Sequence, residues 1–231
     1  MKAVVLLSGG LDSTTMLRMV QELRYEIYAM TFSYGQRNSS EIIAAKNIVK
    51  KYGIKDHRIV NIDLKAFGGS ALTDDTIILN KNGVIDAYDP IKENIPLSYV
   101  PARNTIFLSY ALGFAEVIKA QKIFIGANAI DYSGYPDCRP QYFEAFNKMA
   151  MIATASAVTN ELVIQVETPL LFLKKSEIIA NGLRLGVDYG DTVSCYDADD
   201  DGVACGVCDA CFLRLAGFAA NNIQDHAKYR G

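Results

Sequence analysis

The feature that most constrains the fold is an apolar run that leads directly into a glycine turn near the start of the chain. Lys2–Leu7 is rich in valine and leucine without polar alternation, which is typical of a strand buried on both faces of a parallel sheet. Ser13–Leu23 follows with apolar residues at helical spacing. A buried strand, a turn and an amphipathic helix form one strand–helix unit, so we expect an α/β fold.

The same alternation continues along the chain. Further strands are predicted over Tyr25–Phe32, Arg58–Ile62, Lys122–Ala127 and Leu162–Val166, and helices over Asn104–Lys119, Gln141–Thr159 and Ser176–Leu185. Another helix is expected between Asn38, which precedes Glu41 by three as in a capping box, and Gly53. Residues 64–96 break the rhythm, and a small hairpin is predicted there, turning near Asn82 and Gly83. This order predicts a doubly wound, mostly parallel, Rossmann-like sheet with an insertion at about 64–96.

The turn "SGGLDS" (residues 8–13) has the residue types of an anion site. Gly9 and Gly10 let the backbone approach an anion closely, and the following helix N-terminus would present N–H groups to phosphate oxygens. Ser8 and Ser13 add hydroxyl donors, and Asp12 could hold Mg²⁺. The spelling matches neither the dinucleotide fingerprint nor the lysine-containing P-loop. A generic strand-to-helix turn with a capping serine is the alternative interpretation.

Composition excludes several classes of protein. The chain has 231 residues and a formal net charge of −3, which argues against a nucleic-acid-binding surface over the whole chain. No apolar run reaches the roughly 18–20 residues that cross a bilayer, and the N-terminus lacks a signal-peptide pattern. We therefore expect a cytoplasmic protein that does not contact the membrane.

Four of the five cysteines lie close together near the C-terminus, with the spacing C-x9-C-x2-C-x2-C. Clustered cysteines in a reducing compartment suggest a metal site before disulfides. Four thiolates suit tetrahedral Zn²⁺, and the predicted ligands are Cys195, Cys205, Cys208 and Cys211. Buried free cysteines, an iron–sulfur cluster and catalytic sulfur transfer remain alternatives. We expect an α/β domain over residues 1–190 and a zinc-binding segment over 191–231.

Several polar stretches should face the glycine turn. Asp131–Pro140 follows a predicted strand, and its aromatic and acidic side chains could recognise a flat heterocycle while Arg139 meets a carboxylate or phosphate. Arg37 ends the segment after the second strand, and Arg103 precedes a helix, so both are candidate anion ligands. Lys174 and Lys175 lie just before a predicted helix, and one of them could neutralise phosphates. Solvated surface side chains or helix caps are the alternative interpretation of each.

Taken in order, the motifs resemble one enzyme family. "SGGLDS" is similar to the pyrophosphate loop of the PP-loop ATP pyrophosphatases, which have an adenine nucleotide alpha hydrolase-like fold and adenylate their substrates. Adding "SYGQR", "VPARN", "DYSGYPDCR", "TPL" and "CGVCDACFLR" makes the chain resemble the 7-cyano-7-deazaguanine synthase (QueC) family, up to about Gly217. Members of that family often have glycine where this chain has Ala102.

The resemblance implies a reaction and a set of residues. The family converts 7-carboxy-7-deazaguanine, ammonia and ATP to the nitrile 7-cyano-7-deazaguanine (preQ0), a precursor of queuosine and archaeosine, through an adenylated acid and an adenylated amide. It implies catalytic roles for Asp12, Ser13, Arg103 and Lys175. The implied ATP-binding residues are Leu7, Ser8, Gly9, Gly10, Leu11, Asp12, Ser13, Thr14, Thr15, Met16 and Leu17. The implied substrate-binding residues are Arg37, Asp131, Tyr132, Ser133, Asp137 and Arg139.

The implied cofactors are ATP, Mg²⁺ and Zn²⁺, and the implied partners are small-molecule substrates and a second copy of the chain, with no direct contact to nucleic acid. Neither His57 nor His226 lies in a motif, so neither is assigned as a base. The main rival is a PP-loop tRNA-modifying sulfur transferase that uses cysteines or an iron–sulfur cluster. A non-enzymatic adenine-nucleotide module and another amide-forming ligase, related to NAD or GMP synthetases, are weaker rivals because they lack the cysteine tail.

Overall fold

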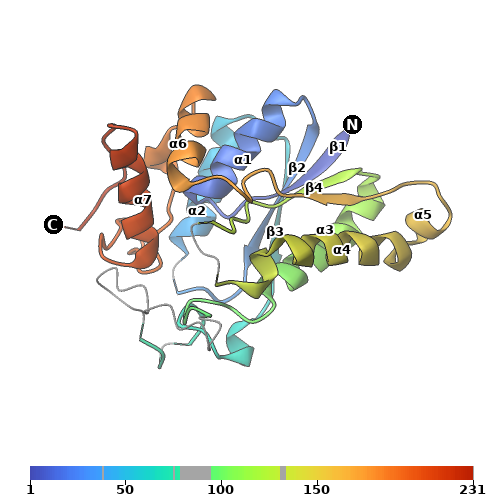
Figure 1. The fold of residues 1–231 in the computed structure, drawn as a ribbon, viewed down its shortest axis with the longest axis horizontal. Helices are drawn as coiled ribbons and strands as arrows, with labels where there is room; N and C mark the ends of the chain where they lie inside the picture. Colours follow the sequence, from blue (N-terminus) through green and yellow to red (C-terminus); the bar gives the residue numbers. More distant parts are fainter. Residues whose placement is uncertain (38, 75, 79–94, 131–133, 231) are drawn as a thin grey trace.

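The computed structural model describes residues 1–37, 39–74, 76–78, 95–130 and 134–230. In this part of the chain, five parallel strands form one sheet in the order β3-β2-β1-β4-β5 (Figure 1). The strands are β1 (Lys2–Leu6), β2 (Glu26–Ser33), β3 (Asp56–Asn61), β4 (Lys122–Phe124) and β5 (Gln165–Glu167). The predicted parallel α/β sheet is therefore confirmed.

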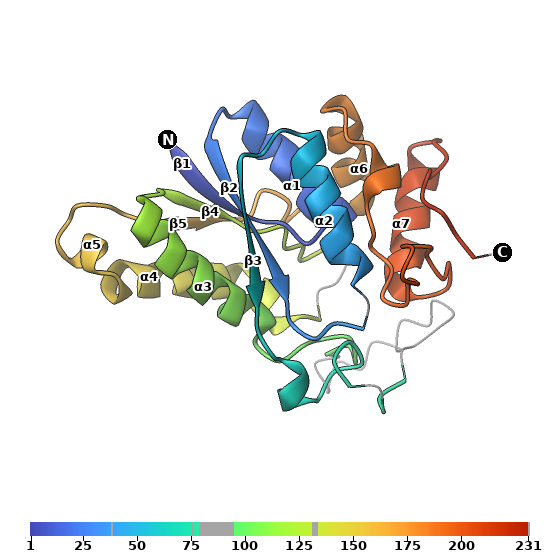
Figure 2. The ribbon, with the colours of Figure 1, turned by 180° about the vertical axis from the view of Figure 1, so that it is seen from behind.

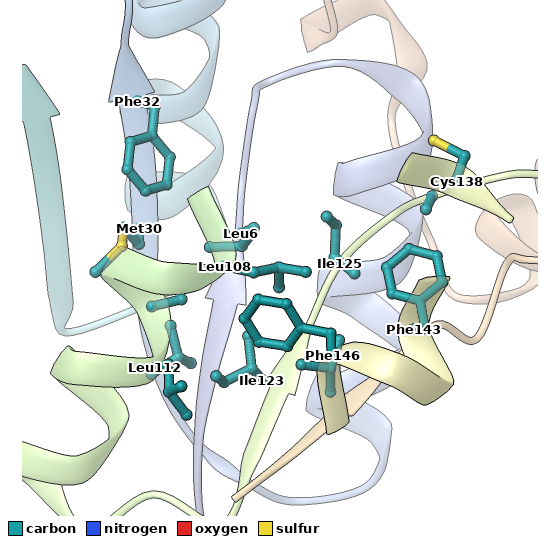
Figure 3. Close-up of a cluster of buried hydrophobic side chains, with 14 of the residues drawn as sticks. Leu6, Met30, Phe32, Leu108, Leu112, Ile123, Ile125, Cys138, Phe143 and Phe146 are labelled. Atoms are coloured by element: carbon teal, nitrogen blue, oxygen red, sulfur yellow. The ribbon is translucent and has the colours of Figure 1, made fainter. Parts of the chain in front are cut away.

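Strand β1 lies at the centre of the sheet and is buried on both faces. Val4 and Leu6 belong to one apolar cluster, whereas Ala3 and Val5 belong to the cluster on the opposite face. Figure 3 shows Leu6 packed among side chains from β2, β4 and two helices. The absence of polar alternation in β1 follows from this position, because neither face of the strand meets water.

Helices cover both faces of the sheet. On one face lie α1 (Leu11–Glu22), α2 (Ser40–Lys51), α6 (Lys175–Arg184) and α7 (Asp209–Ala220), and on the other α3 (Arg103–Ile118) and α4 (Pro140–Ala153), as Figure 2 shows from behind. Shorter elements are η1 (Lys65–Phe67), η2 (Pro136–Cys138), α5 (Ala155–Val158) and η3 (Tyr189–Asp191). The chain winds from β1 to β3 in one direction and then returns to β4 and β5 in the other. The topological switch therefore falls between β1 and β4, where such folds bind ligands.

Several predicted bounds differ from the structure, and strand β4 ends at Phe124 rather than at Ala127. The single helix predicted over Gln141–Thr159 is broken at Thr154, whose φ of −114° and ψ of 144° are extended, so α4 and α5 are separate. Strand β5 begins at Gln165 rather than Leu162, because it pairs only with β4, whose three residues set its length. The hairpin predicted near Asn82 and Gly83 lies outside the described residues.

Helix α7 is not among the predicted elements, because its first turn lies within the cysteine motif. It packs closely on α6: a β-carbon placed at Gly217 would lie 2.7 Å from Cγ of Lys175 and 2.8 Å from Cδ1 of Ile179. The cysteine-bearing segment is therefore held against the sheet's helical layer through α6.

Candidate functional site

A cavity of about 300 Å³ opens at the carboxyl ends of β1, β2 and β4, at the topological switch. Its wall includes the turn between β1 and α1, the segment after β2, the first turn of α3, and residues from α6 and α7. Parallel strands place their carboxyl ends at one edge, so motifs far apart in sequence meet here. The sequence prediction that these motifs face a common cleft is consistent with this arrangement.

The glycine turn is fixed by its contact with α2. Gly9 has a φ of +88°, and a β-carbon at this position would lie 2.3 Å from the carbonyl oxygen of Glu41 and 2.8 Å from the backbone nitrogen of Ala45. Both the left-handed conformation and the close approach of α2 require glycine. The turn and the N-terminus of α2 are therefore packed as one unit.

The serines of the turn bond to one another and to its backbone. The hydroxyl oxygens of Ser8 and Ser13 are 3.0 Å apart, and the N–H of Gly10 donates to Oγ of Ser8 at 3.2 Å. Leu7, Ser8, Gly10, Leu11, Asp12 and Ser13 line the cavity. Thr14, Thr15, Met16 and Leu17, also predicted to bind ATP, are fully buried in α1. Their side chains serve the packing of that helix.

Lys175 and Asp12 form an ion pair at the cavity wall. Nζ of Lys175 lies 2.7 Å and 2.8 Å from the two carboxylate oxygens of Asp12. The lysine side chain is 14% exposed and the aspartate side chain 29% exposed, so the pair is shielded from bulk water but accessible from the cavity. Two residues that the resemblance makes catalytic, 163 positions apart in sequence, are thus in contact.

The residues just before the first clustered cysteine also hold the glycine turn. The N–H of Val193 donates to the carbonyl of Gly9 at 3.0 Å, and Oγ of Ser194 accepts from the N–H of Leu11 at 3.0 Å. Both Val193 and Ser194 line the cavity. Their role could not be predicted from the sequence, because no local pattern marks a serine that bonds to the chain 183 positions away.

A buried arginine extends this support to the end of the chain. Arg214 pairs with Asp225 through two hydrogen bonds of 2.6 Å and 2.9 Å, and the two side chains are only 4% and 2% exposed. Arg214 also donates to Oγ1 of Thr192 at 2.7 Å and to the carbonyl of Tyr189 at 2.7 Å. This network could not be predicted from the sequence for the same reason: its members meet only in the folded chain.

The first turn of α3 contributes Arg103 to the cavity. Its guanidinium donates to the hydroxyl of Tyr34 at 3.4 Å and lies 5.8 Å from the centre of that ring. The preceding Ala102 has a φ of +53°, in the left-handed region that glycine adopts most readily. A glycine at this position would adopt the same conformation with less strain.

Asp137 lies beside the cavity but is directed at the backbone. Its carboxylate accepts from the N–H of Asn104 at 2.9 Å, while the Asn104 side chain donates to the carbonyl of Asp137 at 3.0 Å and to Sγ of Cys138 at 3.3 Å. Burial raises the pKa of Asp137, and the hydrogen bond from Asn104 and the charge of Arg103 oppose that rise. Asp137 therefore ties η2 to the N-terminus of α3.

The other predicted substrate residues have different positions. Arg37 lines the cavity and donates to the carbonyls of Asp74 at 3.2 Å and Ile77 at 3.0 Å. Arg139 is the residue before α4 and is not among the described residues that line the cavity. The residues Asp131, Tyr132 and Ser133 lie outside the described part of the chain.

Glu41, which sequence analysis interpreted as a helix-capping residue, lines the cavity. Helix α2 begins at Ser40 with Ser39 before it, so Glu41 is not the third helical residue that a capping box requires, and that interpretation is wrong. Burial raises the pKa of Glu41 to about 7, and the charge of Arg103 works against this rise. The available signal was that a helix N-terminus after a parallel strand lies at the ligand-binding edge.

The four clustered cysteines meet the requirements of a metal site. Their sulfur atoms all lie within 4.8 Å of one another, and those of Cys195 and Cys208 are 3.9 Å apart. Four thiolates at about 2.3 Å from a tetrahedral Zn²⁺ would be separated by about 3.8 Å. The N–H of Cys205 donates to Sγ of Cys195 at 3.2 Å, which helps to stabilise a thiolate. These four residues could hold a metal ion.

The remaining cysteine, Cys138, lies apart from that cluster in the core shown in Figure 3. It is 6% exposed, and burial raises the pKa of its thiol to about 11. A neutral thiol in this position packs as a small apolar group.

In the described part of the chain, no helix has the length and apolar character to cross a membrane.

Comparison with known proteins gives a consistent result. Residues 2–222 match the family model described as "Queuosine biosynthesis protein QueC". The chain is 52% identical to proteins named "7-cyano-7-deazaguanine synthase" from Rickettsia akari, with 99% of each chain covered, and from Desulfatibacillum aliphaticivorans, with 99% of this chain and 96% of that one covered. Among solved structures, an NMN synthetase from Francisella tularensis has a TM-score of 0.50 at 17% identity, covering 96% of this chain and 78% of that one, which shows a similar fold.

Proposed function

The chain belongs to the QueC family of queuosine biosynthesis proteins, and we propose that it converts 7-carboxy-7-deazaguanine and ammonia to 7-cyano-7-deazaguanine at the expense of ATP. The observation that carries this proposal is the 52% identity to proteins named 7-cyano-7-deazaguanine synthase over 99% of the chain. The alternative, a tRNA-modifying sulfur transferase, is not favoured, because these relatives are named 7-cyano-7-deazaguanine synthase.

The chemistry requires the same activation twice. A carboxylate resists attack by ammonia because oxide is a poor leaving group, whereas an adenylated carboxylate releases AMP. Ammonia then gives an amide, and adenylation of the amide oxygen followed by loss of AMP gives the nitrile. Each adenylation expels pyrophosphate, so a site for this reaction must stabilise negative charge on that leaving group.

The glycine turn is the proposed site for the ATP phosphates. Ser8, Gly10 and Ser13 line the cavity at the N-terminus of α1, where N–H groups and the helix dipole favour an anion. Asp12 offers the carboxylate oxygens that Mg²⁺ prefers, and binding of that ion would draw Asp12 away from Lys175. The lysine would then be available to a phosphate oxygen. Catalysis would rest mainly on positioning and charge.

Arg37 and Arg103 line the cavity and are proposed to form its substrate side. Asp131, Tyr132 and Ser133, at the start of the motif Asp131–Pro140, are proposed to contribute to it as well. An arginine there could pair with the carboxylate of the substrate. Asp137 would act from behind this surface, since its carboxylate accepts a hydrogen bond from Asn104, and Arg139 stays a proposed substrate ligand from the residue before α4.

The cysteine cluster is proposed to bind a structural Zn²⁺. All four ligand positions are taken by thiolates in that arrangement, which leaves no open position for catalysis. The ion would tie the segment after Val193 to α7 and thereby stabilise the support of the glycine turn. We accordingly retain residues 1–190 as the ATP-binding domain and 191–231 as the zinc-binding segment.

Three further proposals follow from membership of the family. The protein acts on small molecules in the cytoplasm, does not bind nucleic acid directly, and forms a homodimer. Exposed apolar side chains on the outer faces of α3 and α4, including Val117, Met151 and Ile152, offer area for such a contact.

One incubation tests the proposed function. The purified protein, mixed with 7-carboxy-7-deazaguanine, an ammonium salt and MgATP, is expected to yield the amide and then the nitrile by mass spectrometry, with AMP and pyrophosphate as co-products. An incubation without ammonia should yield neither. Absence of both products from an enzyme that is folded and contains metal would refute the proposal.

A further inference from the structure

Glu41 lies directly beside the glycine turn. It is the second residue of α2, and its own carbonyl oxygen lies against Gly9, while its side chain reaches the cavity. The segments that would hold the leaving group and present Glu41 are therefore fixed relative to one another. Glu41 and the residues of the glycine turn therefore line the same cavity.

The charged groups around the cavity already have partners, with one exception. The other charged side chains that line it in the described part of the chain are Asp12, Arg37, Arg103, Lys175 and Arg214. Asp12 is bonded to Lys175, Arg214 is bonded to Asp225, and Arg37 donates to two backbone carbonyls. The carboxylate of Glu41 accepts no hydrogen bond from the residues that the structure describes. It is the carboxylate in this wall that is free to take a proton.

The electrostatic environment suits that role. Burial raises the pKa of Glu41 to about 7, while the positive charge of Arg103 limits the rise. Tyr34, whose hydroxyl accepts from Arg103, also interacts electrostatically with Glu41. A base with a pKa near the working pH is partly ionised and still basic enough to accept a proton, which is the best compromise for general-base catalysis.

We propose that the Glu41 carboxylate is the general base that accepts the protons lost by nitrogen, first as the amide forms and then as the nitrile forms. This inference rests on the proposed function. In the first step the ammonia nitrogen bonds to the carbonyl carbon, the C–O bond to AMP breaks with its electrons on the phosphate oxygen, and one N–H proton passes to Glu41.

The second step needs the same base twice. The adenylated amide carries two N–H protons on a positively charged nitrogen. Both protons leave, the C–O bond to AMP breaks, and a carbon–nitrogen triple bond remains. Glu41 returns each proton to water before it accepts the next. Adenylation itself needs no base, because the attacking oxygen carries no proton that must be removed first.

The test separates adenylation from the later steps. Wild-type enzyme, Glu41→Gln and the control Glu144→Gln, which changes an exposed residue of α4, are compared from about pH 5.5 to about pH 8.5. Substrate-dependent exchange of pyrophosphate into ATP reports adenylation, and single-turnover mass spectrometry reports the amide and the nitrile. We expect Glu41→Gln to keep exchange within about twofold and to lose roughly 100-fold in amide formation near pH 7.

The remaining readouts decide the role of the carboxylate. The acidic limb of the wild-type pH–rate profile should vanish in Glu41→Gln, and added acetate should restore part of the activity of Glu41→Ala. Equal losses of pyrophosphate exchange and amide formation in Glu41→Gln would overturn the inference. So would a Glu41→Gln variant whose rate of amide formation and acidic limb are those of the wild type. A wild-type enzyme that shows neither exchange nor product would instead refute the proposed function, and this inference with it. Thermal melts of each variant identify any loss caused by misfolding.

Discussion

Oγ of Ser194 accepts a hydrogen bond of 3.0 Å from the backbone N–H of Leu11, the first residue of α1. Ser194 directly precedes Cys195, so a residue beside the cysteine cluster fixes the start of the helix that carries the glycine turn. Arg214 approaches the same hydroxyl at 3.4 Å. The cysteine segment thus supports the cavity from outside the sheet.

We expect Ser194→Ala to weaken ATP binding more than it weakens the fold. The lost hydrogen bond is worth about 1 kcal/mol, which corresponds to roughly a fivefold rise in KM for ATP, with kcat less affected. Steady-state kinetics with varied ATP measures this effect. Ser109→Ala, which removes an exposed hydroxyl on α3, is the control and should leave KM unchanged. A KM equal to that of wild type in Ser194→Ala would contradict the role.

Asp12→Ala should abolish nitrile formation while the protein still folds. The substitution removes the proposed Mg²⁺ ligand and leaves Lys175 without its bonded carboxylate. A loss of 100-fold or more, roughly, is typical when a group that stabilises transition-state charge is removed. Product formation is followed by mass spectrometry, and circular dichroism checks the fold. Substantial retained activity in a folded variant would exclude this role for the turn.

Removal of the metal should destabilise the protein and also weaken ATP binding. Four thiolates within 4.8 Å of one another repel when they lose their ion, and the segment around Val193 would loosen. We expect one zinc per chain by elemental analysis, a lower melting temperature after chelation, and loss of zinc in Cys208→Ser. Cys138→Ser, outside the cluster, should keep its zinc. A chelated protein with unchanged melting temperature and metal content would argue against the site.

Ala102→Gly should stabilise the protein. Ala102 has a φ of +53°, and this conformation costs a residue with a β-carbon about 1 kcal/mol relative to glycine. The greater freedom of glycine in the unfolded chain offsets part of the gain. Chemical denaturation is the measurement. In Ala216→Gly, an exposed position within α7, the same replacement should destabilise by about 1 kcal/mol, because the backbone there is helical.

We expect Glu41 to lower the free energy of unfolding as pH rises. Its pKa is about 7 in the folded protein, against 4.5 ordinarily, so the folded state binds this proton more tightly than the unfolded state does. The contribution is fully present below about pH 4.5 and is lost as pH rises through about 7, with a total change of up to about 3 kcal/mol. Denaturation of wild type and Glu41→Gln across this range isolates it. Parallel curves for the two proteins would show that Glu41 makes no such contribution.

The sheet could be predicted because its information is local. Every residue from Ala3 to Leu6 is apolar, and the helices beside this strand repeat their apolar residues at helical spacing. The glycine turn and the four cysteines were found for a similar reason, since each is a compact motif. The order of the strands then brings the motifs that line the cavity to the same edge of the sheet.

The parts that sequence analysis missed depend on distant contacts. Ser194 matters only because it meets Leu11, and Arg214 only because Asp225 returns to it from the end of the chain. The spacing of Asn38 and Glu41 predicts a capping box, whereas α2 begins at Ser40 and Glu41 lines the cavity. Asp137 carries the right chemistry for substrate recognition, yet its partner is the backbone of α3, which no local pattern indicates.

The contact between Gly9 and the carbonyl of Glu41 has an evolutionary consequence. A larger residue at position 9 would displace the helix that carries the proposed base, and a shift of that helix would reshape the turn proposed to grip phosphate. A change in the position of the glycine turn therefore requires a change in the position of α2, and the reverse. Selection on how the leaving group is held is therefore, at this point of the molecule, also selection on where the proton goes.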